Sequence, residues 1–434
     1  MTGPEAQRLA QRFAVMLGGE VLQSLFHFGL NLALVRALSA HDYGLFAMVF
    51  GLAAVALTFV RAVAGVPAAT FIPQARSGPA ARALAVSFGT GAVVSALALG
   101  LLTALAFAPF VGAGALAAGA LVTAWSLRSF LRTLLIVRGR AGVAGLSDLA
   151  YAVSGMALLG LLLWGEPGAL LWDSLWLLAV AHGIGLVAAL AILREPIRID
   201  LRRAGRRYRR LWRAFAWSVA ATATANLQGQ GPMLLVGLLA GPAAYAPIAA
   251  VLVLFSPLRL LGTVVVNLTQ PEMARLIAAG ETRRLRRVAA AGSAALTAAC
   301  LGYGGAILVL AGPIEAHLFA GRFAQDPFVL IVGLVWATVT LTMLYAGPKT
   351  LIETRLGFRD LAAMALASAT VGMVLVTALV VLVAPAWSMA GVAISEIIVL
   401  VWCWRRAPGR AGATPAPRAA GLSRLVPALV RRLP

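Results

Sequence analysis

Residues 83–108, ALAVSFGTGAVVSALALGLLTALAFA, form one apolar run without a single charged side chain. A run of this length covers the hydrocarbon core of a bilayer, which takes about 20 apolar residues per helix. The rest of the chain has the same character, because 61% of its residues are hydrophobic, 12% are charged and the mean hydropathy is +0.91. A soluble core cannot bury that much apolar surface. The sequence therefore indicates an integral membrane protein whose function lies inside its membrane bundle.

Twelve such stretches follow one another with little polar sequence between them. Long Gly- and Ala-rich runs satisfy their backbone polar groups in lipid only as helices, and the 44 glycines favour close helix packing. The sequence predicts an all-α, polytopic membrane protein with about twelve transmembrane helices. The spans are expected at residues 13–35, 44–66, 83–108, 113–137, 149–165, 170–193, 212–239, 243–268, 288–311, 327–347, 360–383 and 387–404.

Basic residues are concentrated on one side of this topology. With the N-terminus in the cytoplasm, 30 of the 36 Lys and Arg residues fall on the cytoplasmic side, and only Arg36 and Arg322 fall on the other. This positive-inside pattern places both termini in the cytoplasm of a bacterial inner (plasma) membrane. We attribute the net charge of +21 to this topology and to attraction for anionic membrane lipids. Nucleic acid is not an expected partner, because the basic loops carry no folded platform.

The chain resembles two copies of a six-span unit. In the second span of each copy an arginine, Arg61 or Arg259, precedes a proline by 12 residues, and Arg132-Thr133 in span four matches Lys349-Thr350 in span ten. Since six is even, the halves form a parallel repeat with a pseudo-two-fold axis along the membrane normal, and transporters often bind substrate between such halves. The expected parts are a cytoplasmic N-terminus (1–12), a six-helix lobe (13–193), a basic cytoplasmic linker (194–212), a second six-helix lobe (213–404) and a basic cytoplasmic tail (405–434).

Five basic residues lie within or at the ends of predicted spans and are candidate substrate-binding groups: Arg61, Arg128, Arg132, Arg259 and Lys349. An arginine in the middle of a membrane costs about 2.5–3.5 kcal/mol on insertion scales, so it normally faces a wet cavity or a partner. A cavity lined by guanidinium groups suits an anionic substrate, above all one that carries phosphate. The alternative, strongest for Arg132 near a span end, is that the side chain only extends to the headgroups.

Acidic and amide side chains supply the other candidates. Glu20 and His27 lie about seven residues apart on one face of span one, where a carboxylate and an imidazole could couple a proton or cation to transport. The alternative for Glu20 is neutralisation of a cavity arginine. Four amides in spans one and seven are candidate glycan contacts or, equally, interhelical hydrogen-bonding groups: Asn31, Asn226, Gln228 and Gln230. Glu396 is expected to have a packing role or to form an ion pair, and Asp173 and His182 are weaker candidates for a functional role.

Signatures of catalysis and of cofactor binding are missing from the sequence. It has no GxxxxGK[ST] phosphate-binding loop, no HExxH or Cys/His cluster and no GxSxG. The two cysteines, Cys300 and Cys403, fall in separate spans and indicate neither a disulfide framework nor a metal site. We therefore expect neither an enzyme nor a bound cofactor or metal.

Residues 34–47, LVRALSAHDYGLFA, carry a family resemblance. The segment is similar to the first outer loop of polysaccharide (O-antigen and exopolysaccharide) flippases of the multidrug/oligosaccharidyl-lipid/polysaccharide (MOP) exporter superfamily. That resemblance implies two six-helix lobes around a central cavity, as in the multidrug and toxin extrusion (MATE) transporters. Related lipid II flippases carry arginines in spans one, two and eight. Arg61 and Arg259 match spans two and eight, whereas Glu20 and His27 occupy span one, which disfavours lipid II.

The resemblance implies a flippase that moves a polyprenyl-diphosphate-linked oligosaccharide from the inner to the outer leaflet by alternating access, for polysaccharide biosynthesis. The arginines would hold the diphosphate, and a polysaccharide polymerase and glycosyltransferases would be its partners. Three alternatives stay open: a MATE-type exporter, a lipid II-type exporter, and a non-transporting membrane scaffold for a polysaccharide synthase.

Overall fold

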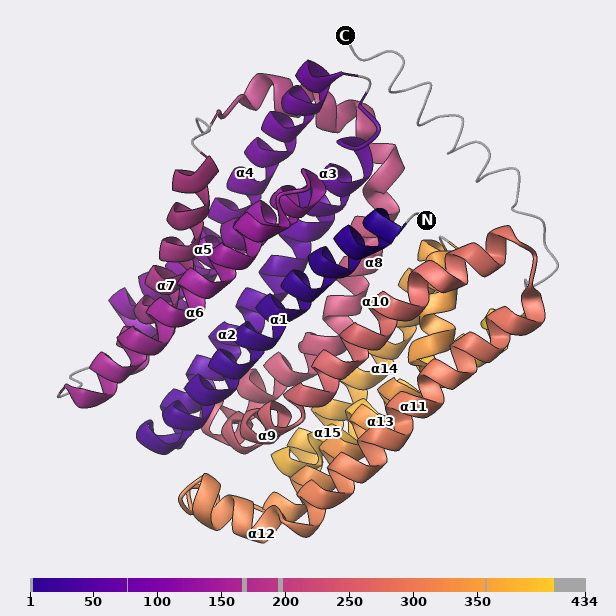
Figure 1. The fold of residues 1–434 in the computed structure, drawn as a ribbon. Coiled ribbons are helices and arrows are strands. Elements are labelled where there is room, and N and C mark those ends of the chain that lie inside the picture. Colours follow the sequence, from indigo (N-terminus) through magenta and orange to yellow (C-terminus); the bar gives the residue numbers. More distant parts are fainter. Residues whose placement is uncertain (1–2, 76, 166–169, 194–197, 356, 410–434) are drawn as a thin grey trace. The chain divides into compact units, whose positions relative to one another are not determined.

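The computed structural model describes residues 3–75, 77–165, 170–193, 198–355 and 357–409. These residues are almost entirely helical and contain no β-strand (Figure 1). Two compact units divide them, and each is considered by itself. The first holds the described residues up to Phe26 and from Leu52 to Val219. The second holds His27–Gly51 and the described residues from Ala220 onward.

The helices of the first unit come mainly from the first half of the chain. Helix α5 packs against α4, α6 and α7 and so forms the centre of this unit. Helices α1, α2 and α8 each contribute one part to this unit and continue into the second. The bounds are α1 Gly3–Ala37, α2 Ala40–Val60, a π-helical turn Arg61–Gly65, α3 Val66–Phe71, α4 Gly78–Val111, a 3₁₀ turn Gly112–Gly114, α5 Ala115–Val137, α6 Ala141–Trp164, α7 Leu170–Leu193 and α8 Leu201–Ala240.

The second unit has its centre at α13, which packs against α10, α11 and α15, while α14 packs against α15. The bounds are α9 Pro242–Leu254, α10 Ser256–Ala278, α11 Thr282–Val309, α12 Ala311–Pro313, a π-helical turn Ile314–Leu318, α13 Phe328–Thr354, α14 Phe358–Leu382, a 3₁₀ turn Pro385–Trp387 and α15 Ser388–Gly409.

All twelve predicted spans fall on helices, and the all-α membrane fold is confirmed. In the described part of the chain, nine helices are long and apolar enough to cross a membrane, or up to ten if the bent pair α9–α10 counts as one span. Helices α1 and α8 are not among them. The predicted span 243–268 is divided between α9 and α10, and the chain bends by 48° between these two helices. Pro257 explains the break, since it has no N–H to continue the helical hydrogen bonding.

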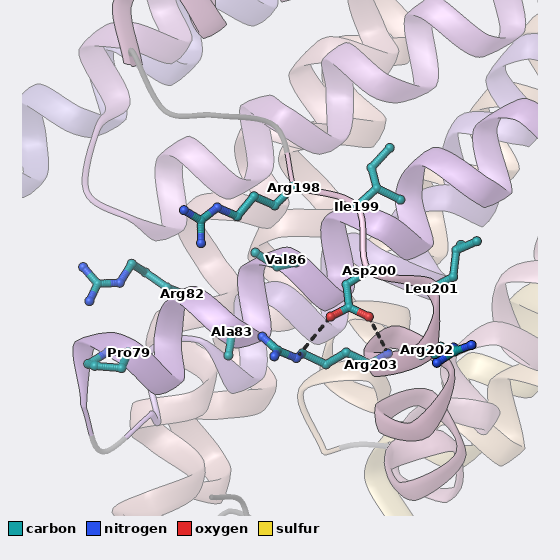
Figure 2. Close-up of a pocket in the computed structure, with 10 residues that line it drawn as sticks. All are labelled: Pro79, Arg82, Ala83, Val86, Arg198, Ile199, Asp200, Leu201, Arg202 and Arg203. Carbon is teal, nitrogen blue, oxygen red and sulfur yellow. Dashed lines mark hydrogen bonds and ion pairs between the residues drawn. The ribbon is translucent and has the colours of Figure 1, made fainter.

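The basic linker predicted at 194–212 is, from Leu201 onward, the beginning of α8. Asp200 starts this helix: its Oδ1 accepts a hydrogen bond of 2.8 Å from the N–H of Arg203, and its carbonyl accepts one of 2.9 Å from the N–H of Ala204 (Figure 2). An aspartate at this position satisfies N–H groups that have no partner within the helix. The helix therefore begins eleven residues before the predicted span at 212.

Small residues allow the helices to approach closely, as the glycine content predicted. A Cβ added at Gly100 in α4 would lie 2.7 Å from the carbonyl oxygen of Gly119 in α5. A Cβ at Gly347 in α13 would lie 2.0 Å from the carbonyl oxygen of Ala289 in α11. Membrane helices gain their association energy from such backbone-to-backbone packing, because lipid offers no hydrophobic driving force between them. The division into lobes at 13–193 and 213–404 stays a prediction.

Candidate functional site

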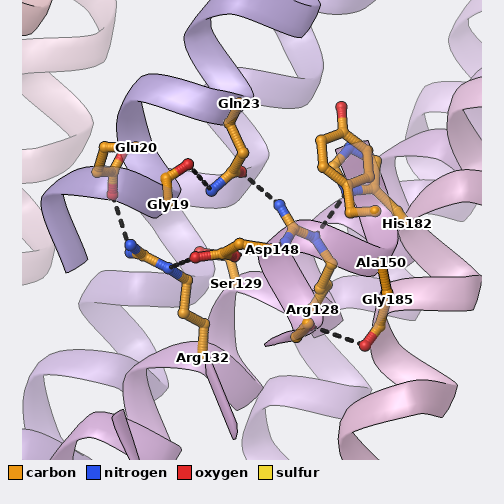
Figure 3. A network of polar contacts seen from close by, with 12 residues as sticks. Gly19, Glu20, Gln23, Arg128, Ser129, Arg132, Asp148, Ala150, His182 and Gly185 are labelled. Atoms are coloured by element: carbon orange, nitrogen blue, oxygen red, sulfur yellow. Dashed lines mark hydrogen bonds and ion pairs between the residues drawn. The ribbon is translucent and has the colours of Figure 1, made fainter. Parts of the chain in front are cut away.

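A buried polar cluster lies among α1, α5, α6 and α7 in the first unit (Figure 3). The Arg128 side chain is 2% exposed, and each of its nitrogens has a partner. Its Nη1 is 2.8 Å from Oδ1 of Asp148, its Nε donates to Nδ1 of His182 at 3.0 Å, and its Nη2 donates to Oε1 of Gln23. The Tyr151 ring covers the guanidinium at 4.3 Å from ring centroid to Cζ. These contacts connect α5 to α1, α6 and α7, so Arg128 acts as a structural residue, called here an internal brace.

Arg132 extends the cluster toward the surface. Its Nε contacts Oδ2 of Asp148 at 2.9 Å, and its Nη1 contacts Oε1 of Glu20 at 2.8 Å. The Arg132 side chain is 16% exposed and that of Glu20 is 46% exposed. Two arginines thus face two carboxylates, and the cluster has no net charge. Neutrality is expected here, because an uncompensated buried charge costs several kcal/mol.

Helical spacing explains how the sequence builds this cluster. Arg128 and Arg132 are four residues apart and share one face of α5. A short connection leads from α5 to α6, and Asp148 comes two turns into α6, where its two oxygens meet one arginine each. His182 lies flat between Trp125 and Tyr151, with ring centroids 5.2 and 4.1 Å away. Since arginine can only donate, Nδ1 of His182 is the acceptor and this imidazole is neutral.

The second unit has a buried polar cluster of different composition. Gln228 of α8 donates its Nε2 to Oε1 of Glu396 at 2.9 Å, and Tyr345 of α13 donates its hydroxyl to Oε2 at 2.6 Å. All three residues are less than 8% exposed. No arginine or lysine hydrogen-bonds this carboxyl group within the part of the chain that the structure describes. Glu396 is therefore held by neutral donors alone, and Lys349, half-buried, follows one turn after Tyr345 on α13.

The two repeat-related arginines differ sharply from Arg128 and Arg132. Arg61, in the first unit, and Arg259, in the second, both have solvent-accessible side chains, and Tyr245 lies close enough to Arg259 to interact with it electrostatically. Neither guanidinium makes a hydrogen bond or ion pair with the residues that the structure describes. Each also lies at an irregularity of its helix. Arg61 opens the π-helical turn after α2, and Arg259 follows the break at Phe255. Single π-helical turns occur frequently at functional sites.

The remaining sequence candidates lie in the second unit. Asn31 donates to the carbonyl of His27 at 2.8 Å and accepts from the Tyr43 hydroxyl at 3.4 Å. The His27 ring meets the Phe50 ring edge-on, with centroids 5.1 Å apart. Asn226 and Gln230 are half-buried on α8. Glu20 and His27, predicted as one ion-coupling pair, thus belong to different compact units.

Sequence reasoning missed Asp148, Gln23 and Tyr345. Asp148 lies one residue before the predicted span at 149–165, so the prediction assigned it to a loop. Gln23 follows Glu20 by three residues and shares its helix face, which is a usable signal. Tyr345 precedes Lys349 by four residues, as Arg128 precedes Arg132, so the repeat could have indicated it.

The segment 34–47 that carries the family resemblance has a structural role where α1 ends and α2 begins. Ser39 and Asp42 cap the start of α2, with the Ser39 hydroxyl 2.8 Å from Oδ2 of Asp42. Arg36 donates to the carbonyls of Leu318 and His317 at 2.8 and 2.5 Å, and Arg322 donates to the carbonyl of Arg36 at 2.6 Å. The motif therefore ties the α1–α2 hairpin to the loop before α13.

Solved structures of MATE transporters share this fold. The eukaryotic MATE transporter AtDTX14 matches with a TM-score of 0.66 over 97% of this chain and 99% of its own, at 13% identity. An inward-facing multidrug resistance MATE family transporter of the MOP superfamily matches with a TM-score of 0.62 over 93% of this chain and 96% of its own, at 10% identity.

A MOP superfamily transporter from Pyrococcus furiosus, for which a reversed polarity of the binding pocket is said to suggest a different function, matches with a TM-score of 0.53. Its identity is 12%, over 94% of this chain and 96% of its own. No protein-family model matches the sequence, and no curated protein matches it. The likenesses establish a multi-pass membrane protein with the MATE-like fold that the sequence predicted.

Proposed function

We propose that this protein is a flippase that moves a polyprenyl-diphosphate-linked oligosaccharide from the inner to the outer leaflet of a bacterial inner membrane. One observation carries the proposal. Arg61 and Arg259 are exposed cations within apolar spans and lack an acidic partner among the described residues, whereas Arg128 and Arg132 are neutralised by Asp148 and Glu20. A cation left unpaired in a membrane span is costly and marks a site that awaits an anion.

A phosphate group of the diphosphate suits each of these two arginines considered by itself. A guanidinium binds phosphate oxygens in a bidentate manner and stays charged at any physiological pH. Lys349, half-buried in α13, is a third proposed contact. Arg132 and Arg128 can join only by exchanging Glu20 or Asp148 for the substrate, so their proposed part is secondary in the conformation described.

The glycan and coupling roles follow from the remaining polar groups. Asn31, Asn226 and Gln230 are the proposed glycan contacts, while Gln228 would first have to release Glu396. A diphosphate carries roughly two negative charges, so a potential of 100 mV, inside negative, favours its outward movement by about 4–5 kcal/mol. Transport can then proceed without ATP, with Glu20 and His27 as proposed carriers of a returning proton or cation.

A MATE-type exporter is the second candidate, and Glu396 favours it. Glu396, held by Tyr345 and Gln228 without a basic partner among the described residues, is the proposed contact for a transported cation in such an exporter. An exporter of this kind would protect cells from cationic toxic compounds. Restored drug resistance in a sensitive strain, without any restored glycan, would favour it over the flippase.

The decisive experiment is complementation of a bacterial strain that lacks its own polysaccharide flippase. The wild type is expected to restore surface glycan, and Arg61→Ala and Arg259→Ala are expected to abolish it at equal protein abundance in the membrane. Arg283→Ala is the matched control, since Arg283 is exposed at the start of α11 and outside the proposed site. Full activity of either site variant would remove the diphosphate assignment.

A further inference from the structure

A basic pocket opens where the first turns of α4 approach the beginning of α8, within the first unit (Figure 2). It has a volume of about 990 Å³, which is large enough for a lipid headgroup. None of the sequence candidates for substrate binding lies in it. The lining residues are Pro79, Arg82, Ala83, Val86, Arg198, Ile199, Asp200, Leu201, Arg202 and Arg203.

The pocket has an excess of positive charge. Asp200 pairs with Arg203 at 3.3 Å, which leaves Arg82, Arg198 and Arg202 without a hydrogen bond or ion pair in the described part of the chain. Figure 2 shows Arg82 and Arg198 extending to the same side of the pocket. One turn further along α8, burial and then its neighbours Arg203 and Arg210 lower the pKa of Arg207, which is a sign of the same positive field.

Exposed apolar side chains lie at the pocket, and exposed tryptophans lie further along α8. Ile199 and Leu201 are 56% and 64% exposed and extend on the side away from Arg82 and Arg198 (Figure 2). Trp212 and Trp217 are exposed about three and four turns after Leu201 on α8. Tryptophan is enriched at the level of the headgroups, and basic residues beside it contact lipid phosphates. Guanidinium groups and an apolar surface thus lie side by side, as a lipid requires.

We propose that this pocket binds the phosphate headgroup of an anionic phospholipid from the leaflet that faces it. Arg82 and Arg198 hold the phosphate oxygens, and Ile199 and Leu201 contact the beginning of the acyl chains. The exposed apolar pair favours a lipid over a soluble phosphate compound. This site is separate from Arg61 and Arg259 and does not depend on the proposed flippase function.

The test is a titration of the delipidated full chain in detergent, followed by native mass spectrometry. The probes are short-chain phosphatidylglycerol, short-chain phosphatidylcholine and glycerol phosphate. Each arginine near an anionic lipid contributes roughly a fivefold gain in affinity. The pair Arg82→Gln and Arg198→Gln is therefore expected to weaken phosphatidylglycerol binding about 25-fold, and each single variant about fivefold. Unchanged elution and melting temperature show that the variants are folded.

The matched control is the pair Arg283→Gln and Arg287→Gln, which removes the same charge from exposed turns of α11 outside the pocket. Its binding is expected to stay within about twofold of the wild type. An equal loss in the control and pocket variants would mean diffuse attraction and would overturn the site. Equal binding of phosphatidylcholine would overturn the anionic headgroup, and equal binding of glycerol phosphate would overturn the lipid.

Discussion

The substitution Asp148→Asn tests the buried cluster of the first unit most directly. It removes the carboxylate that Arg128 and Arg132 share at 2.8 and 2.9 Å, and leaves the guanidinium of Arg128, 2% exposed, without a counter-charge. Removing one partner of a buried ion pair costs about 3–5 kcal/mol. At about 2 °C per kcal/mol for a large chain, the melting temperature should fall by roughly 6–10 °C.

Thermal unfolding of the purified protein in detergent, followed by tryptophan fluorescence, measures this effect. Glu20→Gln is the internal control, because it removes the other acid of the cluster at a position that is 46% exposed. An exposed ion pair contributes about 0–1 kcal/mol, so this variant should melt within about 2 °C of the wild type. The contrast between the two acids separates the effect of burial from the effect of charge.

A double variant completes the argument. Arg128→Met combined with Asp148→Leu removes both buried charges and leaves Arg132 paired with Glu20. Apolar replacement of a whole buried pair is often neutral or stabilising, so most of the lost stability should return. A wild-type melting temperature for Asp148→Asn, or a double variant no more stable than that single variant, would refute the assignment of Arg128 as an internal brace.

Three further predictions concern local contacts. Tyr345→Phe removes a hydrogen-bond donor to the buried carboxyl group of Glu396 and should lower the free energy of unfolding by about 1.5–3 kcal/mol. Tyr303→Phe removes a hydrogen bond to the carbonyl of Leu254 and should lower it by about 0.5–1.5 kcal/mol. Equal melting temperatures of the two variants would contradict this difference. Gly100→Ala should destabilise by about 1–3 kcal/mol because its methyl group overlaps α5, while Gly302→Ala, with open space around it, should stabilise by about 0.5–1 kcal/mol. Asp200→Ala should cost about 0.5–2 kcal/mol and speed amide exchange in the first turn of α8, and unchanged exchange there would argue against the cap.

The sequence was sufficient for the fold class because hydrophobic length alone separates membrane helices from everything else. It could not locate the break at Phe255, since a proline in a membrane span is compatible with either a kink or a straight helix. It also placed the start of α8 too late. The hydrophobic stretch begins only after the arginines that precede residue 212, whereas the helix itself begins at Leu201, next to its cap Asp200, and includes those arginines.

The candidate site was predicted less completely, because the residue type at one position does not show which other side chain it contacts in the folded protein. Arg128 and Arg61 look alike in the sequence, as arginines inside apolar spans. Only the packing of α5 against α6 and α7 shows that the first meets Asp148 and His182, while the second remains exposed. The roles of Arg61 and Arg128 in substrate binding stay predictions. Because Arg61 is exposed and Arg128 is buried and paired, variants of Arg61 test substrate binding more directly.

The Arg128–Asp148 pair also bears on how the chain enters the membrane during synthesis. Helix α5 carries two arginines, each of which opposes insertion by about 2.5–3.5 kcal/mol when it lies alone near the bilayer centre. Their shared acid arrives only with α6, the next helix to leave the ribosome. We expect α5 to remain at the translocation machinery until α6 emerges, so that the two helices enter lipid together with Asp148 compensating one arginine and Glu20 of the earlier helix α1 compensating the other.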